Sequence, residues 1–252
     1  MSQPDGWTAN SPISQDAWAD FQKQRAAVFD HLAYLRTSLY LLRQIAGFPF
    51  DKLTAEEDRI FFTMTGRALY ETAVLAVTKL TTDQAGDVLT LNRFRNSVLK
   101  MLRPELADAF REQLKTTRFD EAAKSVAERV RDLRNARVAH LSLTEVLAAS
   151  TPVVQLRELE QLADDTERLY EPLLFGASAS FLPIAYDPTV RDANAHVDTD
   201  IEKILNSFAR QSYALNLPEQ NKLVWPRHRA TMSADELDTF NYWRRRAGLP
   251  EA

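Results

Sequence analysis

Residues 120–141 read DEAAKSVAERVRDLRNARVAHL and decide how the chain folds. Apolar side chains recur here at intervals of three and four residues, at Ala123, Val126, Val130 and Leu133. This spacing places them on one side of an α-helix and leaves the charged residues on the other. The segment therefore predicts an amphipathic helix that buries one stripe and ends in a polar, basic run.

The same helical periodicity extends through the rest of the chain. The predicted helices cover 16–45, 55–80, 91–102, 104–114, 153–175, 201–215 and 232–246. Thr54 and Glu57 have the spacing of a capping box, and Pro152 suits the first turn of the helix that follows it. We expect an all-α, up-and-down helical bundle at residues 16–180, a flexible arm at 1–15, and a C-terminal extension at 181–252 with one or two helices.

The composition agrees with a helical, intracellular protein. The 252 residues include only six glycines, too few for a fold rich in hairpins or phosphate-binding glycine loops. There is no cysteine, which excludes disulfides, thiolate zinc sites and cysteine nucleophiles. The first fifteen residues have no secretory-signal pattern, and no apolar run suits a membrane span. We expect a cytoplasmic protein without membrane contact.

The charge is unevenly distributed along the chain. The net charge is −4, yet residues 91–140 carry twelve Lys/Arg against seven Asp/Glu. A basic region on an acidic protein can be a site for an anionic partner, although a salt-bridged helix face is the simpler interpretation. The four histidines are far apart and show no metal-ligand spacing, so we expect no metal site and no cofactor.

An Arg followed five or six positions later by a His occurs three times, and chance alone would supply about one such pair. The pairs are Arg25/His31, Arg134/His140 and Arg191/His196. The second pair stands apart because it reads Arg-Asn at its start and Ala-His at its end, and because a strongly periodic helix leads into it. Context therefore singles out Arg134 and His140, with Asn135 beside them, among the three pairs.

The octapeptide LRNARVAH at 133–140 resembles the motif of the HEPN superfamily, in particular its abortive-infection (Abi) U-type branch. The order of helices at 16–180 is similar too, including an apolar helix that ends in Leu80-Thr81-Thr82-Asp83. The resemblance implies a metal-independent endoribonuclease that acts as a homodimer through the motif helix. It also implies a role in phage defence or a toxin–antitoxin-like system, with an antitoxin or other regulatory partner.

The implied chemistry suits these residue types. RNA carries its own nucleophile, the 2′-hydroxyl, so the protein has to move protons and stabilise an anionic phosphorane. His140 would exchange the protons, Arg134 would bind the phosphate with its guanidinium fork, and Asn135 would position the phosphate or the imidazole. Arg137 would add charge toward the RNA, and Glu71, on the helix at 55–80, is a further candidate that could reach the motif helix.

Two alternatives remain open at this stage. Some HEPN relatives only bind RNA, nucleotides or other proteins, so the chain could be a non-catalytic module. Arg244, Arg245 and Arg246, beside Tyr242 and Trp243, could form a second RNA contact; a basic last helical turn that complements the helix dipole is the simpler interpretation. In a straight helix Arg134 and His140 would lie about 120° apart, which favours a site shared between two subunits.

Overall fold

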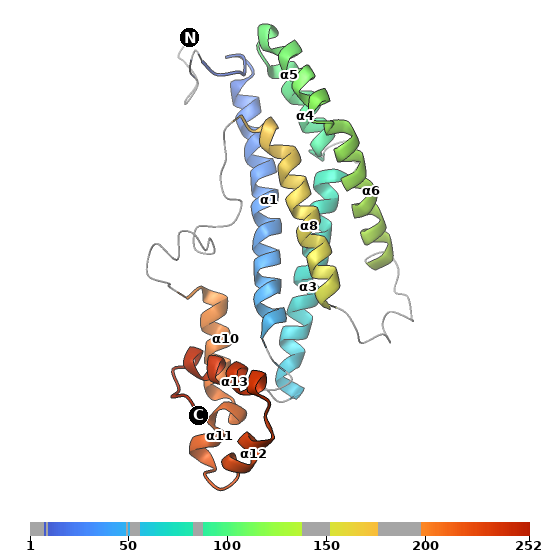
Figure 1. Ribbon diagram of the computed structural model, residues 1–252. Coiled ribbons are helices and arrows are strands. Elements are labelled where there is room, and N and C mark those ends of the chain that lie inside the picture. The colour runs from blue at the N-terminus through green and yellow to red at the C-terminus, as the bar shows by residue number, and fades with distance from the viewer. Residues whose placement is uncertain are drawn as a thin grey trace. The chain divides into compact units, whose positions relative to one another are not determined.

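The computed structural model confirms an all-α protein (Figure 1). It describes residues 8, 10–48, 50, 56–82, 88–137, 152–175 and 198–252, with only the helical backbone given for 56–59, 134–137 and 152–155. Within these ranges the sole β feature is an isolated bridge between Ile13 and Leu102. The helices are α1 (Trp18–Gly47), α3 (Glu56–Thr81), α4 (Leu91–Met101), α5 (Pro104–Thr116), α6 (Phe119–Arg137), α8 (Pro152–Tyr170) with a 3₁₀ turn (Glu171–Leu173), α10 (Asp200–Gln211), α11 (Tyr213–Gln220), α12 (Trp225–Thr231) and α13 (Ala234–Arg246).

The contacts divide the chain into two compact units, and the division differs from the predicted domain boundaries. The first unit contains Met1–Leu39 and Leu69–Ile184, and the second contains Tyr40–Ala68 and Ala185–Ala252. Helices α1 and α3 each contribute residues to both units. The physical reason is length, since α1 has 30 residues whereas α8 has 19. The end of α1 and the start of α3 therefore extend beyond the first unit and belong to the second unit with the C-terminal helices.

In the first unit the predicted apolar stripe of α6 is buried. Ala123, Val126, Val130 and Leu133 all have at most 6% of their surface exposed, and α6 packs against α5 and α8. The apolar side of α8, including Leu159 and Leu162, is buried as well. Burial of this stripe fixes the rotation of α6 about its own axis, and with it the face that its polar residues occupy.

Charged side chains fasten α8 to its neighbours in the same unit. Arg36 of α1 donates to Asp164 at 2.5 Å and to Glu167 at 2.6 Å. Burial lowers the pKa of Arg36, but the hydrogen bonds and attraction of the two carboxylates outweigh burial and raise it overall. Arg129 of α6 donates to Asp165 of α8 at 2.6 Å. These pairs connect α1 and α6 to one face of α8.

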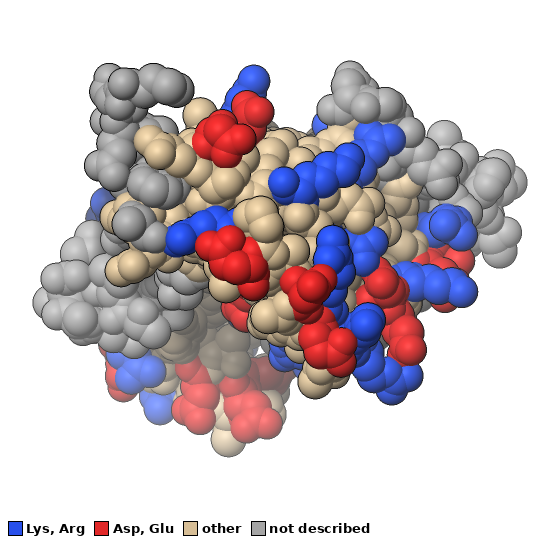
Figure 2. Space-filling view, turned by 90° about the horizontal axis from the view of Figure 1, so that it is seen from above, with Lys and Arg blue, Asp and Glu red and all other residues tan. Residues whose placement is uncertain are grey.

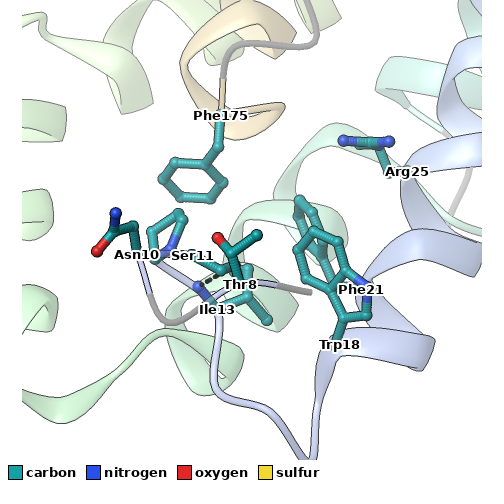
Figure 3. A pocket seen from close by; sticks show the side chains of 9 residues that line it. Thr8, Asn10, Ser11, Ile13, Trp18, Phe21, Arg25 and Phe175 are labelled. Carbon is teal, nitrogen blue, oxygen red and sulfur yellow. Dashed lines mark hydrogen bonds between the residues drawn. The ribbon is translucent and has the colours of Figure 1, made fainter. Parts of the chain in front are cut away.

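The segment before α1 lies against α4 and α5. The Ser14 backbone N–H donates to Met101 O at 2.9 Å, Arg103 N–H donates to Pro12 O at 3.0 Å, and Ile13 is fully buried. Residues 11–14, which we expected in a flexible arm, are therefore fixed by backbone hydrogen bonds. Residues 11–13 line a pocket of about 160 Å³ in which Phe175 faces Trp18 and Phe21 (Figure 3).

The second unit has an aromatic cluster and a buried arginine. Phe48 packs on Trp243 at 4.7 Å between ring centroids, and Phe62 packs on Phe208 at 5.0 Å. Arg244 is fully buried, donates to Pro250 O at 2.5 Å, and pairs with Glu219 through both terminal nitrogens.

The structure assigns all three C-terminal arginines to internal contacts. Arg245 pairs with Glu251 at 2.9 Å, and Arg246 lies 3.4 Å from Asp198 and 3.6 Å from Glu202. Arg244 is buried against Glu219. The hypothesis of an RNA patch at 244–246 is therefore wrong for Arg244, which is buried. The Arg245 side chain is 62% exposed, so its contact with RNA stays a prediction.

One segment, Ile60–Thr81 of α3, is long and apolar enough to cross a membrane by length and composition alone. Core helices of soluble proteins pass the same test. Arg67, Glu71 and Lys79 interrupt the segment, and a charge in the middle of a membrane helix is costly, by roughly 2.5–3.5 kcal/mol on insertion scales. The absence of membrane contact stays a prediction.

Candidate functional site

The candidate site lies at the C-terminal end of α6. Arg134, Asn135 and Arg137 occupy the last turn of this helix, directly after the buried Leu133. His140 lies outside the described residues, three positions beyond the end of α6. Glu71, partly exposed on α3, belongs to the same compact unit as α6. Three of the predicted residues, Arg134, Asn135 and Arg137, therefore have backbones in the same helical turn.

A groove of about 490 Å³ runs beside α6 in the same unit. It is formed by the end of α3, the start of α4 and the polar face of α6. The lining residues are Thr81, Thr82, Thr90, Asn92, Arg93, Arg95, Asp120, Lys124, Ala127 and Arg131. Four of them are cationic and one is acidic, so the groove is basic although the chain as a whole is not.

The residues that α6 contributes to the groove form a row leading to the candidate site. Asp120, Lys124, Ala127 and Arg131 are spaced by four, three and four positions. Positions seven or eleven residues apart differ by roughly 20° around a helix, so Arg134 falls in line with Ala127 and Asn135 with Lys124. Arg137, roughly 80° from Ala127 around the axis, lies outside this row. The face of α6 that lines the groove therefore continues to the backbone positions of Arg134 and Asn135.

The cations of the groove are held differently from one another. Arg95 donates to Asp120 at 2.5 Å and its guanidinium lies 5.7 Å from the centre of the Phe119 ring. Arg93 donates to Val88 O at 2.8 Å. Lys124 is 78% exposed and its ammonium lies 4.0 Å from Glu128. Such an exposed, long pair is weak, so the Lys124 charge is available to a ligand.

Basic and acidic side chains are mixed on the face of the molecule in Figure 2, with no broad field of one sign. Several exposed cations of α5 and early α6 have carboxylate partners three residues away, such as Arg111 with Asp108 and Lys115 with Glu112. Arg131 is exposed and forms no ion pair within the described part of the chain. The positive charge predicted for residues 91–140 is therefore partly neutralised on the surface and stays concentrated in the groove.

Comparison with known families identifies the family of the chain. The family model HEPN_AbiU2, described as AbiU2, matches residues 20–199, well over half of the chain. The chain belongs to this HEPN family. The HEPN match contains α1 to α8 and the whole Arg134–His140 segment, and it ends at Thr199, which caps α10. No curated protein and no solved structure gives a significant match.

Of the other Arg/His pairs of this HEPN protein, Arg25/His31 lies on α1. His31 is exposed on α1, where its Nδ1 lies 2.9 Å from Ala27 O, one turn back in the same helix. His196 lies outside the described residues, and His228 belongs to α12 in the second unit. Within the described ranges there is no cluster of three or more His, Asp or Glu side chains arranged to hold a metal.

Sequence reasoning missed the groove residues contributed by α3 and α4. Helical periodicity relates only residues within one helix. It therefore could not group the residues of α6 with four groove residues from the α3 end and α4, namely Thr81, Thr82, Arg93 and Arg95. Two signals were present, namely the excess of basic residues at 91–140 and the segment Leu80–Asp83 in the HEPN resemblance. Each pointed to one wall of the groove.

Proposed function

We propose that this HEPN protein is a metal-independent endoribonuclease that acts in abortive infection. The observation that carries the proposal is the Arg134-Asn135…His140 segment, which lies within the matched HEPN region and begins in the last turn of α6 beside a basic groove. Its substrate is RNA, and its place of action is the cytoplasm. An antitoxin or another regulatory partner restrains it, since uncontrolled cleavage of RNA would harm the host cell.

The roles follow from the chemistry of RNA cleavage. The 2′-hydroxyl attacks the neighbouring phosphorus, its proton leaves, and the 5′-oxygen of the next nucleotide departs with a proton. His140, with an ordinary pKa of about 6.5, serves either proton transfer near neutral pH. Arg134 binds the phosphate oxygens as their negative charge grows, and Asn135 positions the phosphate or the imidazole. Arg137 and Glu71 are secondary candidates for contacts to the RNA.

The products give the first test. The proposed route leaves a 2′,3′-cyclic phosphate and a 5′-hydroxyl, so cleavage of a defined RNA is expected to continue in excess EDTA. Replacing the ribose by a 2′-deoxy sugar at the scissile nucleotide is expected to stop cleavage there, because the nucleophile is gone. Mass spectrometry of the fragments identifies both ends.

The control for this test is the same RNA with a single deoxy sugar at an uncleaved position, which is expected to be cut normally. Products with 5′-phosphate ends that form only with added metal would contradict the mechanism. RNA binding without any cleavage would instead favour the non-catalytic alternative.

The functional unit is a homodimer that pairs the motif helices of two subunits. A single His140 supplies one proton-transfer group, whereas in-line cleavage uses both an acid and a base. Two copies related by a two-fold axis supply two imidazoles and two guanidinium groups to one cleft.

Mixing two inactive variants tests the shared site. Subunits with Arg134→Ala and subunits with His140→Ala are each expected to be inactive alone and to recover part of the activity when mixed, because one mixed arrangement contains an intact Arg134 and an intact His140. Recovery is measured as the initial cleavage rate after subunit exchange. A fully active species that light scattering finds to be monomeric at micromolar concentration would overturn the homodimer.

A further inference from the structure

The basic groove beside α6 has the features of a binding track for a charged polymer. Its cations come from two helices, α4 and α6, and its hydroxyl groups come from the end of α3 and the cap of α4. The row Lys124, Ala127, Arg131 leads along α6 to Arg134. At about 1.5 Å per residue, Lys124 and Arg134 are roughly 15 Å apart along the axis, enough for about two nucleotides of an extended strand.

We propose that this groove binds the sugar-phosphate backbone of single-stranded RNA and guides it to Arg134. The inference rests on the proposed function, because it assigns the path by which the substrate reaches the candidate site. Lys124 and Arg131 contact phosphates directly. Arg95 is already held in place by Asp120 and Phe119. RNA binding therefore does not have to immobilise this side chain, which reduces the entropic cost of binding.

The threonine hydroxyls favour RNA over DNA as the occupant. Thr81 Oγ1 donates its hydrogen to Val77 O at 2.7 Å, and Thr82 Oγ1 donates to Thr78 O at 3.3 Å. Both hydroxyls line the groove and keep lone pairs with which to accept a hydrogen bond. A ribose 2′-hydroxyl is a donor that DNA lacks, so these oxygens give the groove a means of preferring RNA.

The test measures binding to RNA separately from cleavage. Binding of a fluorescent single-stranded RNA is measured in a His140→Ala background, where cleavage does not interfere, with and without Lys124→Gln plus Arg131→Gln. Glutamine keeps helix propensity and length while removing the charge. The matched control is Arg111→Gln plus Lys115→Gln on α5, which removes the same net charge from exposed positions outside the groove.

The salt dependence gives the expected size of the effect. Each phosphate contact to a single strand contributes about 0.7 to the slope of log affinity against log salt, so losing two contacts lowers the slope by about 1.4. Relative to 1 M salt this corresponds to about 20-fold weaker binding at 0.1 M salt. The α5 control is expected to change affinity less than about threefold, because its charges lie outside the track.

The outcomes separate this inference from the proposed function. Equal losses in the groove and control variants would mean that affinity follows net charge alone, and would overturn the track. Single-stranded DNA of the same sequence that binds as tightly, with the same dependence on Lys124 and Arg131, would overturn the assignment to RNA. A wild type that cleaves no RNA, together with the expected loss in the groove variant, would refute the ribonuclease and leave the track in place. Unchanged KM and rate of cleavage in a Lys124→Gln/Arg131→Gln enzyme would refute the track and leave the ribonuclease.

Discussion

Replacing His140 by alanine is expected to abolish RNA cleavage while leaving the melting temperature within a few degrees of the wild type. General acid–base catalysis by a positioned side chain contributes about 10²–10⁴ in rate, and a dimer that shares two copies loses both. Arg134→Ala is expected to lose a comparable factor, because the phosphorane then lacks its charge-assisted hydrogen bonds. Single-turnover cleavage of an end-labelled RNA measures both losses, and circular dichroism checks the fold.

His31→Ala is the matched control for this prediction. It removes an imidazole that also follows an Arg by six residues, but from an exposed position on α1. Its cleavage rate is expected to stay within about twofold of the wild type, since surface substitutions away from special features usually have small effects. Full activity in the His140→Ala variant would show that the catalytic assignment is wrong.

Replacing Arg244 by alanine is expected to destabilise the second unit by about 3 kcal/mol. The buried guanidinium donates to Leu215 O and Pro250 O and pairs with Glu219, and it lies 5.8 Å from the centre of the Phe240 ring. Its removal leaves carbonyls without their donor, and an unsatisfied buried group costs roughly 1–3 kcal/mol. Urea unfolding followed by the fluorescence of Trp225 and Trp243 measures the loss.

Arg245→Ala provides the comparison, because its guanidinium is exposed and pairs only with Glu251 at 2.9 Å. This change is expected to cost at most about 0.5 kcal/mol, as is usual for exposed pairs. Equal effects of the two substitutions would contradict the structural role of Arg244.

Acid gives an independent measure of the same pair. The hydrogen bond from Arg244 lowers the pKa of Glu219 below its usual 4.5. A carboxylate whose pKa is lower in the folded state stabilises the fold above its unfolded pKa, and this contribution disappears as the pH falls through the folded pKa. The second unit is therefore expected to lose stability below pH 4.5, and Glu219→Gln is expected to reduce that dependence.

Periodicity predicted most helices because each helix buries an apolar stripe, and the spacing of that stripe can be seen within the segment itself. The segments 91–102 and 104–114 correspond to α4 and α5 within about two residues. The predicted helix at 201–215 is in fact two helices, because Ser212 ends α10 and caps α11 by accepting from Leu215 N–H. Trp225 and Pro226, which lie outside every predicted helix, begin α12 with proline in its first turn.

The candidate site was predictable in part for a similar reason. Arg134, Asn135 and Arg137 are local to one helix, so their common position followed from the periodicity of 120–141 and from the resemblance. The groove depends on which helices pack beside α6, and no spacing in the sequence reports the distance between Thr81 and Arg131. The division into two units was missed because it falls inside α1 and α3, at Leu39 and Ala68. Both helices continue through these points, α3 even across Gly66, so the helical pattern shows no boundary there.

Because α1 and α3 are shared between the two units, a truncation of the second unit also affects the stability of the first. A stop codon after Ile184 would remove Phe208 and Trp243, and the rings of Phe62 and Phe48 that pack on them would face water. Exposed aromatic surface on an incompletely packed chain is what chaperones and proteases recognise. Loss of the C-terminal helices is therefore expected to lower the amount of the whole polypeptide in the cell, the first unit included.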